Sequence, residues 1–205
     1  MQGFIVGLNR VRDEDLIVRI ISRDKLLTLY RFYGARHSTI NIGYKIDFQD
    51  ELGVNSSIAR LKDVIHLGYK WLDNTLLLKP WQDFTLLLGR HLRDSYELDS
   101  FYFDLLEFSS SIWHKQNHKR VAIEAYIKLL EHEGRLHSEQ ICFLCSRGIE
   151  DHIALLRGFL PACKECSKRS TISIDGFLDL VHNHSTLYLS DKEVEALYIT
   201  LQEGF

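Results

Sequence analysis

Four cysteines stand in two C-x2-C pairs late in the chain. Cys142 and Cys145 form the first pair, and Cys163 and Cys166 form the second after 17 intervening residues. Two thiolates three positions apart on a tight turn can bind one metal ion, and two such turns complete the tetrahedron that zinc prefers. Because four thiolates leave no open position for water, the spacing predicts one structural zinc ion per chain and not a catalytic metal.

Two other interpretations of the cysteines stay open at this point. A dithiol redox protein needs only one C-x2-C pair, beside a β-α-β pattern that this chain lacks, and the four cysteines could also be incidental. His137 is near enough in sequence to compete as a ligand, although four thiols already suffice. Disulfides are not expected, because thiols stay reduced in a cytoplasm.

Basic residues recur through the first 45 positions, with Tyr30, Phe32, Tyr33 and Tyr44 between them. Cations attract phosphates and exposed bases stack on aromatic rings, so a groove with both suits a single strand of nucleic acid. The alternative is that the rings belong to the core and the charges solvate outer faces. The candidate contacts are Arg10, Arg12, Arg19, Arg23, Lys25, Arg31, Arg36 and Lys45.

Catalytic motifs are not apparent. No acid pair, Ser-His-Asp set or phosphate-binding loop stands out, and we expect that the protein is not an enzyme. The string His182-Asn183-His184 best fits the end of a helix, where polar and cationic groups suit the dipole.

The elements that must position these residues change type along the chain. Five short runs are rich in β-branched and aromatic residues, and five strands without a repeat suit a small closed barrel. These runs are 3–8, 16–21, 26–33, 41–48 and 58–69. Later apolar residues recur every three to four positions, which predicts helices, the first beginning near Pro80. Ser190 and Glu193 predict a capping box at the start of the last helix.

Composition is that of a soluble globular protein, with 45% apolar and 26% charged residues. Residues 1–70 have a charge balance of +3 and the remainder has −6, which modestly favours nucleic-acid contact by the first part. No stretch approaches the roughly 20 apolar residues that cross a bilayer, and the first residues lack the features of a secretory signal. We therefore expect a cytoplasmic protein without membrane contact.

The N-terminal stretch resembles the RecO family of DNA repair and recombination mediators. The resemblance rests on residues 1–5, the acidic turn 13–15 before the strand 16–20, the ending Tyr33 to Arg36, and the segment 43–48. The order of barrel, helical domain and two late cysteine pairs is also similar.

The resemblance implies an α+β fold: an N-terminal OB-fold β-barrel over 1–72, followed by an α-helical domain over 73–205 with a four-cysteine zinc-binding segment at 142–166. It implies that the protein binds single- and double-stranded DNA, anneals complementary strands and helps to load RecA onto DNA coated with single-strand-binding protein, in the RecF pathway. The implied partners are RecR and the C-terminal tail of single-strand-binding protein, and the protein would associate with the nucleoid during repair. Basic residues available for that tail are Arg90, Arg93, Lys115, Lys119, Arg120 and Arg157.

Two alternatives to this function remain. A protein–protein interaction scaffold would keep the structural zinc and bind no DNA directly. A zinc-dependent nuclease or deaminase would need an open metal position and a nearby acid such as an H-x-E arrangement, and the chain shows neither.

Overall fold

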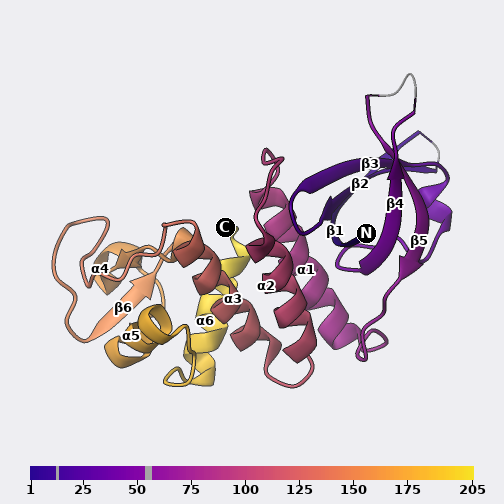
Figure 1. Ribbon diagram of the computed structural model, residues 1–205. Helices are drawn as coiled ribbons and strands as arrows, with labels where there is room; N and C mark the ends of the chain where they lie inside the picture. The colour runs from indigo at the N-terminus through magenta and orange to yellow at the C-terminus, as the bar shows by residue number, and fades with distance from the viewer. Residues whose placement is uncertain (13, 54–56) are drawn as a thin grey trace. The chain divides into compact units, whose positions relative to one another are not determined.

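The computed structural model describes residues 1–12, 14–53 and 57–205. The chain divides into two compact units, Met1–His114 and Lys115–Phe205 (Figure 1). Asp13, which belongs to the acidic turn of the family resemblance, lies outside the described residues.

The first unit is built on a closed five-stranded barrel, which confirms the predicted fold. Its strands follow the order β1-β2-β3-β5-β4, and β4 pairs with β1 to close the ring. All pairs are antiparallel except β3 with β5, which meet in parallel at Tyr30 and Arg60. The strands are β1 (Gln2–Val11), β2 (Asp15–Ile21), β3 (Leu26–Arg31), β4 (Lys45–Glu51) and β5 (Arg60–His66).

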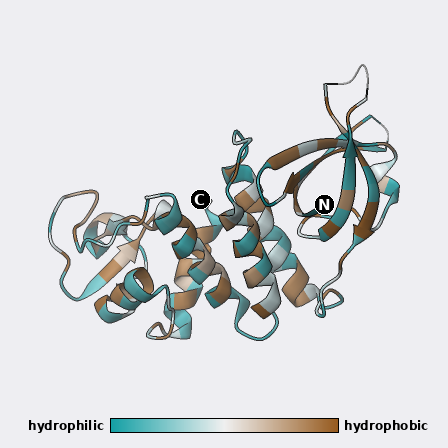
Figure 2. Ribbon diagram, in the orientation of Figure 1, coloured by the Kyte–Doolittle hydropathy of each residue, from teal (hydrophilic) through white to brown (hydrophobic). Residues whose placement is uncertain are grey.

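Alternate residues of each strand face the barrel interior, and these inward residues are mostly apolar. In β2, the buried residues Leu16, Val18 and Ile20 alternate with the half-buried Ile17 and Arg19. Figure 2 shows both hydrophobic and hydrophilic residues along the strands of the barrel. This register leaves Ile17 and Arg19 on the outer face of the barrel.

Three strands are shorter than the sequence predicts, and the fifth strand of the barrel spans Arg60–His66 instead of 58–69. The third ends at Arg31, and Tyr33 just beyond it adopts a left-handed conformation with a φ of 51°, which is unfavourable in a strand. The fourth begins at Lys45 because the chain turns at Gly43, where φ is +80°.

Helices α1 (Thr75–His91) and α2 (Ser100–Ile112) complete the first unit. A Cβ atom placed on Gly89 of α1 would lie only 2.2 Å from the carbonyl oxygen of Val6. Only glycine therefore lets the end of α1 pack directly on the backbone of β1. The predicted boundary at 72/73 separates strands from helices, whereas the compact units divide at 114/115, since α1 and α2 pack against the barrel.

The prediction that the first helix begins near Pro80 is wrong. The helix begins at Thr75, where the Asn74 side chain accepts a hydrogen bond from the Leu76 N–H, and Pro80 lies inside it. An Asn cap satisfies one of the free N–H groups of the first turn, so the helix can begin ahead of the proline.

The second unit contains α3 (His118–His132), α5 (Ile174–Asn183) and α6 (Asp191–Gln202), with the short α4 (Lys164–Ser167). Both predicted helix ends are confirmed. Ser190 and Glu193 form the capping box of α6, and His184 is the left-handed cap at the end of α5.

A small sheet within the second unit was not expected from the sequence. Its strands β6 (His152–Leu155), β7 (Pro161–Ala162) and β8 (Ile172–Ser173) are ordered β7-β6-β8. Strands of two to four residues are too short to show an alternating pattern. Among the described residues, no helix has the length and apolar character required to cross a bilayer.

Candidate functional site

The four cysteines are brought together by two backbone turns. The first follows Ile141, where the Ser146 N–H donates to the Cys142 carbonyl oxygen at 2.8 Å. The second lies where β7 ends and Cys163 becomes the N-cap of α4, which carries Cys166 one turn later. The Phe143 N–H donates to the Pro161 carbonyl oxygen at 2.8 Å and so ties the first turn to the start of the second.

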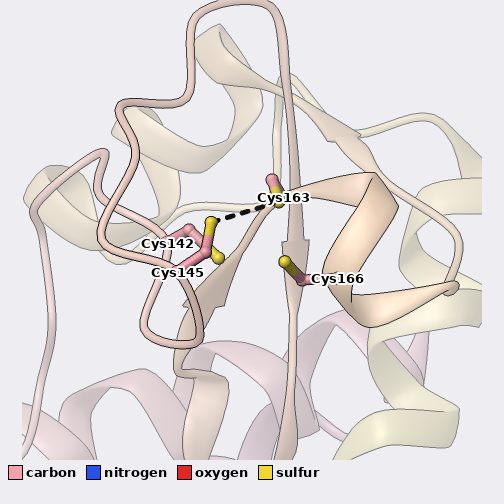
Figure 3. A group of neighbouring side chains, drawn as sticks. All are labelled: Cys142, Cys145, Cys163 and Cys166. Atoms are coloured by element: carbon pink, nitrogen blue, oxygen red, sulfur yellow. Dashed lines mark hydrogen bonds between the residues drawn. The ribbon is translucent and has the colours of Figure 1, made fainter.

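The thiol groups have the spacing of a four-sulfur metal centre. All four sulfur atoms lie within 4.8 Å of one another, and those of Cys145 and Cys163 are 3.9 Å apart. Figure 3 shows the four side chains converging on one space between the two turns. A tetrahedron with Zn–S bonds of about 2.3 Å requires sulfur atoms about 3.8 Å apart. The residues present could therefore hold one metal ion with no ligand from outside the set.

The pKa values of these thiols also favour the binding of a metal cation. Burial raises the pKa of Cys142, but hydrogen bonds from the backbone N–H groups of Cys163 and Cys145 outweigh this effect. The pKa of Cys142 is therefore lowered, to about 6. Hydrogen bonding with the neighbouring sulfur of Cys163 raises the pKa of Cys166 to about 12. Four neighbouring thiols thus resist full ionisation alone, whereas a coordinated metal ion stabilises them as thiolates.

A separate cleft opens on the outer face of the barrel, over the place where β3 meets β5. It has a volume of about 330 Å³ and is lined from both sides of that seam and from the turn after β1. Its lining residues are Val11, Arg12, Ile17, Tyr30, Phe32, Ile58 and Arg60. The face of strands 2 and 3, with the loops after strands 1 and 4, is where OB-type barrels hold oligonucleotides.

The cleft combines aromatic rings with guanidinium groups. The Phe32 ring is 48% exposed and lies edge-on to Tyr30, with ring centres 4.8 Å apart. The Arg60 guanidinium lies over the Phe32 ring, 5.2 Å from the ring centre. Arg12 is exposed at the rim. An exposed ring beside two cations can stack a base and attract its phosphate.

Asp15 holds the end of β3 in this arrangement. Its carboxylate accepts one hydrogen bond from the Tyr30 hydroxyl and another from the Tyr33 N–H, the second at 2.8 Å. These two hydrogen bonds lower the pKa of Asp15, since both stabilise the charged carboxylate. Tyr30 and the backbone after Phe32 are thereby fixed before any ligand binds.

At least five of the eight predicted basic contacts have partners inside the first unit. Arg23 pairs with Asp104 at 3.2 Å, and Lys45 pairs with Glu107 at 2.5 Å and is largely covered. Arg31 donates to the Leu61 carbonyl oxygen at 2.8 Å across the seam between β3 and β5. The other two pairs are Lys25 with Asp24 and Arg36 with Glu14. These five side chains contribute to the fold, and their contact with DNA remains a prediction.

The remaining three lie on the outer surface of the barrel. Arg12 lines the cleft, Arg10 is exposed near the end of β1, and Arg19 lies on the outer face of β2. Arg60 was not among the predicted contacts, because it is separated in sequence from the earlier run of basic residues. The parallel pairing of Arg60 with Tyr30 is what brings it to the cleft, and no local pattern signals such a pairing.

The strand order and the closed barrel define the first unit as an OB-type domain. Residues 1–72 match the family model described as RecO N terminal, so the first part of the chain is similar to the N-terminal domain of RecO proteins. A RecO N-terminal domain in turn suggests a role in DNA repair. No curated protein matches the chain.

Proposed function

We propose that this protein binds single-stranded DNA in the barrel cleft and anneals complementary strands during recombinational repair. The observation that carries the proposal is the exposed Phe32 ring, which contacts both Tyr30 and the Arg60 guanidinium, on the barrel face that OB-folds use. By the same proposal, the protein also binds double-stranded DNA through phosphate contacts and helps to load RecA onto DNA coated with single-strand-binding protein, with RecR as a partner.

Annealing requires no covalent chemistry, and we propose that the protein is not an enzyme. Two strands repel each other through their phosphates, and a protein that partly neutralises both lowers that cost. Stacking on aromatic side chains contributes about 1–3 kcal/mol per base and leaves the base edges open to a complement. Base pairing then supplies the sequence specificity, so binding has little sequence preference.

The four-cysteine centre has a structural part in this proposal, with zinc as its metal. Its turns carry α4 and border the sheet β7-β6-β8, so the ion would hold segment 142–166 in place. Four sulfur ligands match the preference of zinc and leave no position for a substrate.

The tail of single-strand-binding protein, which is acidic and ends in an aromatic residue, has a candidate cleft in the second unit. This cleft is lined by Arg135, His137, Arg157 and Leu160, among others. Two other tail candidates serve the fold, since Arg120 bonds the Leu189 carbonyl oxygen at 2.9 Å and Lys119 pairs with Glu195. Titration with a tail peptide should show weaker binding to Arg157→Glu than to the wild type, and equal binding would contradict this assignment.

A second candidate function is an interaction scaffold that binds proteins only. The first turn of the cysteine centre favours it, because Ile141, Phe143 and Leu144 are each more than half exposed there. Exposed apolar groups of this kind commonly mark a protein interface.

An annealing assay with complementary oligonucleotides separates the two functions. The wild type should accelerate annealing and Phe32→Ala should lose most of that acceleration, while Tyr188→Ala, which removes an exposed ring from the second unit, should not. If the wild type has no effect on annealing or on DNA mobility at low salt, the annealing function is contradicted and the interaction scaffold is favoured.

A further inference from the structure

A group of three arginines lies on the first unit beyond the cleft. Arg19 is on the outer face of β2, and Arg90 and Arg93 lie at the end of α1 and just after it. The pKa of Arg19 is lowered by its partial burial and then by the positive charges of Arg93 and Arg90, while Asp94 opposes the shift. The positive charges of Arg90 and Arg93 therefore lie near enough to Arg19 to act on it, with the Asp94 carboxylate also nearby.

Two close backbone approaches create this arginine cluster. Gly89 lets the last turn of α1 pack on Val6, as described above, which brings Arg90 beside β1. Gly7, the next residue of β1, pairs with Arg19, and a Cβ atom on Gly7 would lie 2.6 Å from the Arg19 Nε. The Arg19 side chain thus lies flat across Gly7, toward the end of α1. Such side-by-side placement of like charges costs stability, which suggests that an anion normally shares the site.

The arginine cluster is continuous with the cleft on one strand face. Ile17 lines the cleft, and Arg19 is the next outward residue of the same strand. On β3, Tyr30 pairs with Ile17 and Thr28 pairs with Arg19. Farther along, the Leu26 N–H donates to the Tyr96 carbonyl oxygen at 2.9 Å, and the Tyr96 ring is 69% exposed. From Tyr30 to Leu26 this face spans about 13 Å.

We propose that Arg19, Arg90 and Arg93 bind the phosphates of the single strand whose bases stack at Phe32. The strand then crosses the outer face of β2 and β3 from the cleft toward Tyr96. This inference rests on the proposed function and deepens it, because it adds to the DNA site two arginines that lie beyond the residues matched to the family. It also gives the site a length, about four to six nucleotides, at the short end of the range for OB-folds.

Fluorescence anisotropy with labelled oligothymidylates of about 3, 6 and 12 nucleotides tests this inference. The wild type should gain affinity steeply from the shortest to the middle length. The double variant Arg90→Glu/Arg93→Glu should lose that gain, and its slope of log affinity against log salt should be shallower by about 1.4 for two lost phosphate contacts. Lys70→Glu/Lys192→Glu makes the same change in net charge at two lysines outside the cleft and the arginine cluster.

The outcomes separate this inference from the proposed function. If the double variant matches the lysine control at every length while Phe32→Ala still weakens binding, the DNA site does not include the arginine cluster. If the double variant keeps its DNA affinity and loses affinity for an acidic peptide, the arginine cluster binds a protein tail instead. If the wild type binds none of the oligonucleotides at low salt, the proposed function fails as well. Unchanged thermal melting of both double variants establishes that folding is not the cause.

Discussion

The guanidinium carbon of Arg60 lies 5.2 Å from the centre of the Phe32 ring, although 28 positions separate the two residues in the chain. The contact depends on the short parallel pairing between β3 and β5, where Tyr30 meets Arg60. A cation over an exposed ring contributes about 0.5–1 kcal/mol. The more important consequence is that an aromatic ring able to stack and a positive charge able to attract phosphate are held together before any ligand binds.

Loss of the Phe32 ring should weaken binding of single-stranded DNA. We expect Phe32→Ala to cost about 1–3 kcal/mol, the range for one stacked base, and Phe32→Trp to retain most of the affinity. Anisotropy at fixed low salt measures both. Equal affinity of Phe32→Ala and the wild type would remove this residue from the site.

Loss of the proposed metal centre should destabilise the second unit without changing the barrel cleft directly. Cys142→Ser and Cys163→Ser each break the four-sulfur set, and metal binding at such sites is coupled to folding. We expect about one zinc per chain by elemental analysis of protein purified without chelator, and a clear fall in melting temperature for both variants. Ser146→Ala, in the same turn but outside the set, is the control. Protein that is fully folded and contains no bound metal would contradict the proposal that the four cysteines hold a structural metal ion.

Acid should weaken the two hydrogen bonds by which the Asp15 carboxylate holds the end of β3. The folded-state pKa of Asp15 is lowered by its hydrogen bonds with Tyr30 and Tyr33, so its contribution to stability is present above the ordinary carboxyl pKa of about 4. That contribution is lost as the pH falls through the lowered, folded-state pKa. Asp15→Asn should therefore show a smaller loss of stability in this acid range than the wild type. Parallel acid dependence of the two proteins, followed by thermal melting, would contradict the role of Asp15.

The close packing of α1 on the barrel predicts a strong effect at Gly89. Gly89→Ala would place its methyl group 2.2 Å from the Val6 carbonyl oxygen, so α1 must shift. Overpacking of this kind costs about 1–3 kcal/mol in the free energy of unfolding. Gly148→Ala, which meets no atom within 4 Å, should change stability little. Urea denaturation of both variants measures the difference, and equal midpoints would show that α1 is not held this closely.

The closed barrel and the cysteine centre were predictable because their signals are local. Alternating apolar residues predict strands. Two C-x2-C pairs predict a metal site even when the two pairs are separated in the sequence. The cleft on the barrel was predictable only in part, because partners far away in sequence decide which arginine side chains are covered. Arg31 bonds across the seam to Leu61 and Lys45 pairs with Glu107, whereas Arg60 reaches the cleft. No pattern in the first 50 residues distinguishes these outcomes.

The central claim is that the barrel cleft binds single-stranded DNA through stacking and phosphate contacts. Anisotropy of a labelled single strand across a salt series tests it most directly. We predict tight binding at low salt that weakens steeply and linearly on a logarithmic scale, and a weaker affinity for Arg60→Ala throughout the series. Binding that is absent at low salt, or that is unchanged between low and moderate salt, would contradict the claim.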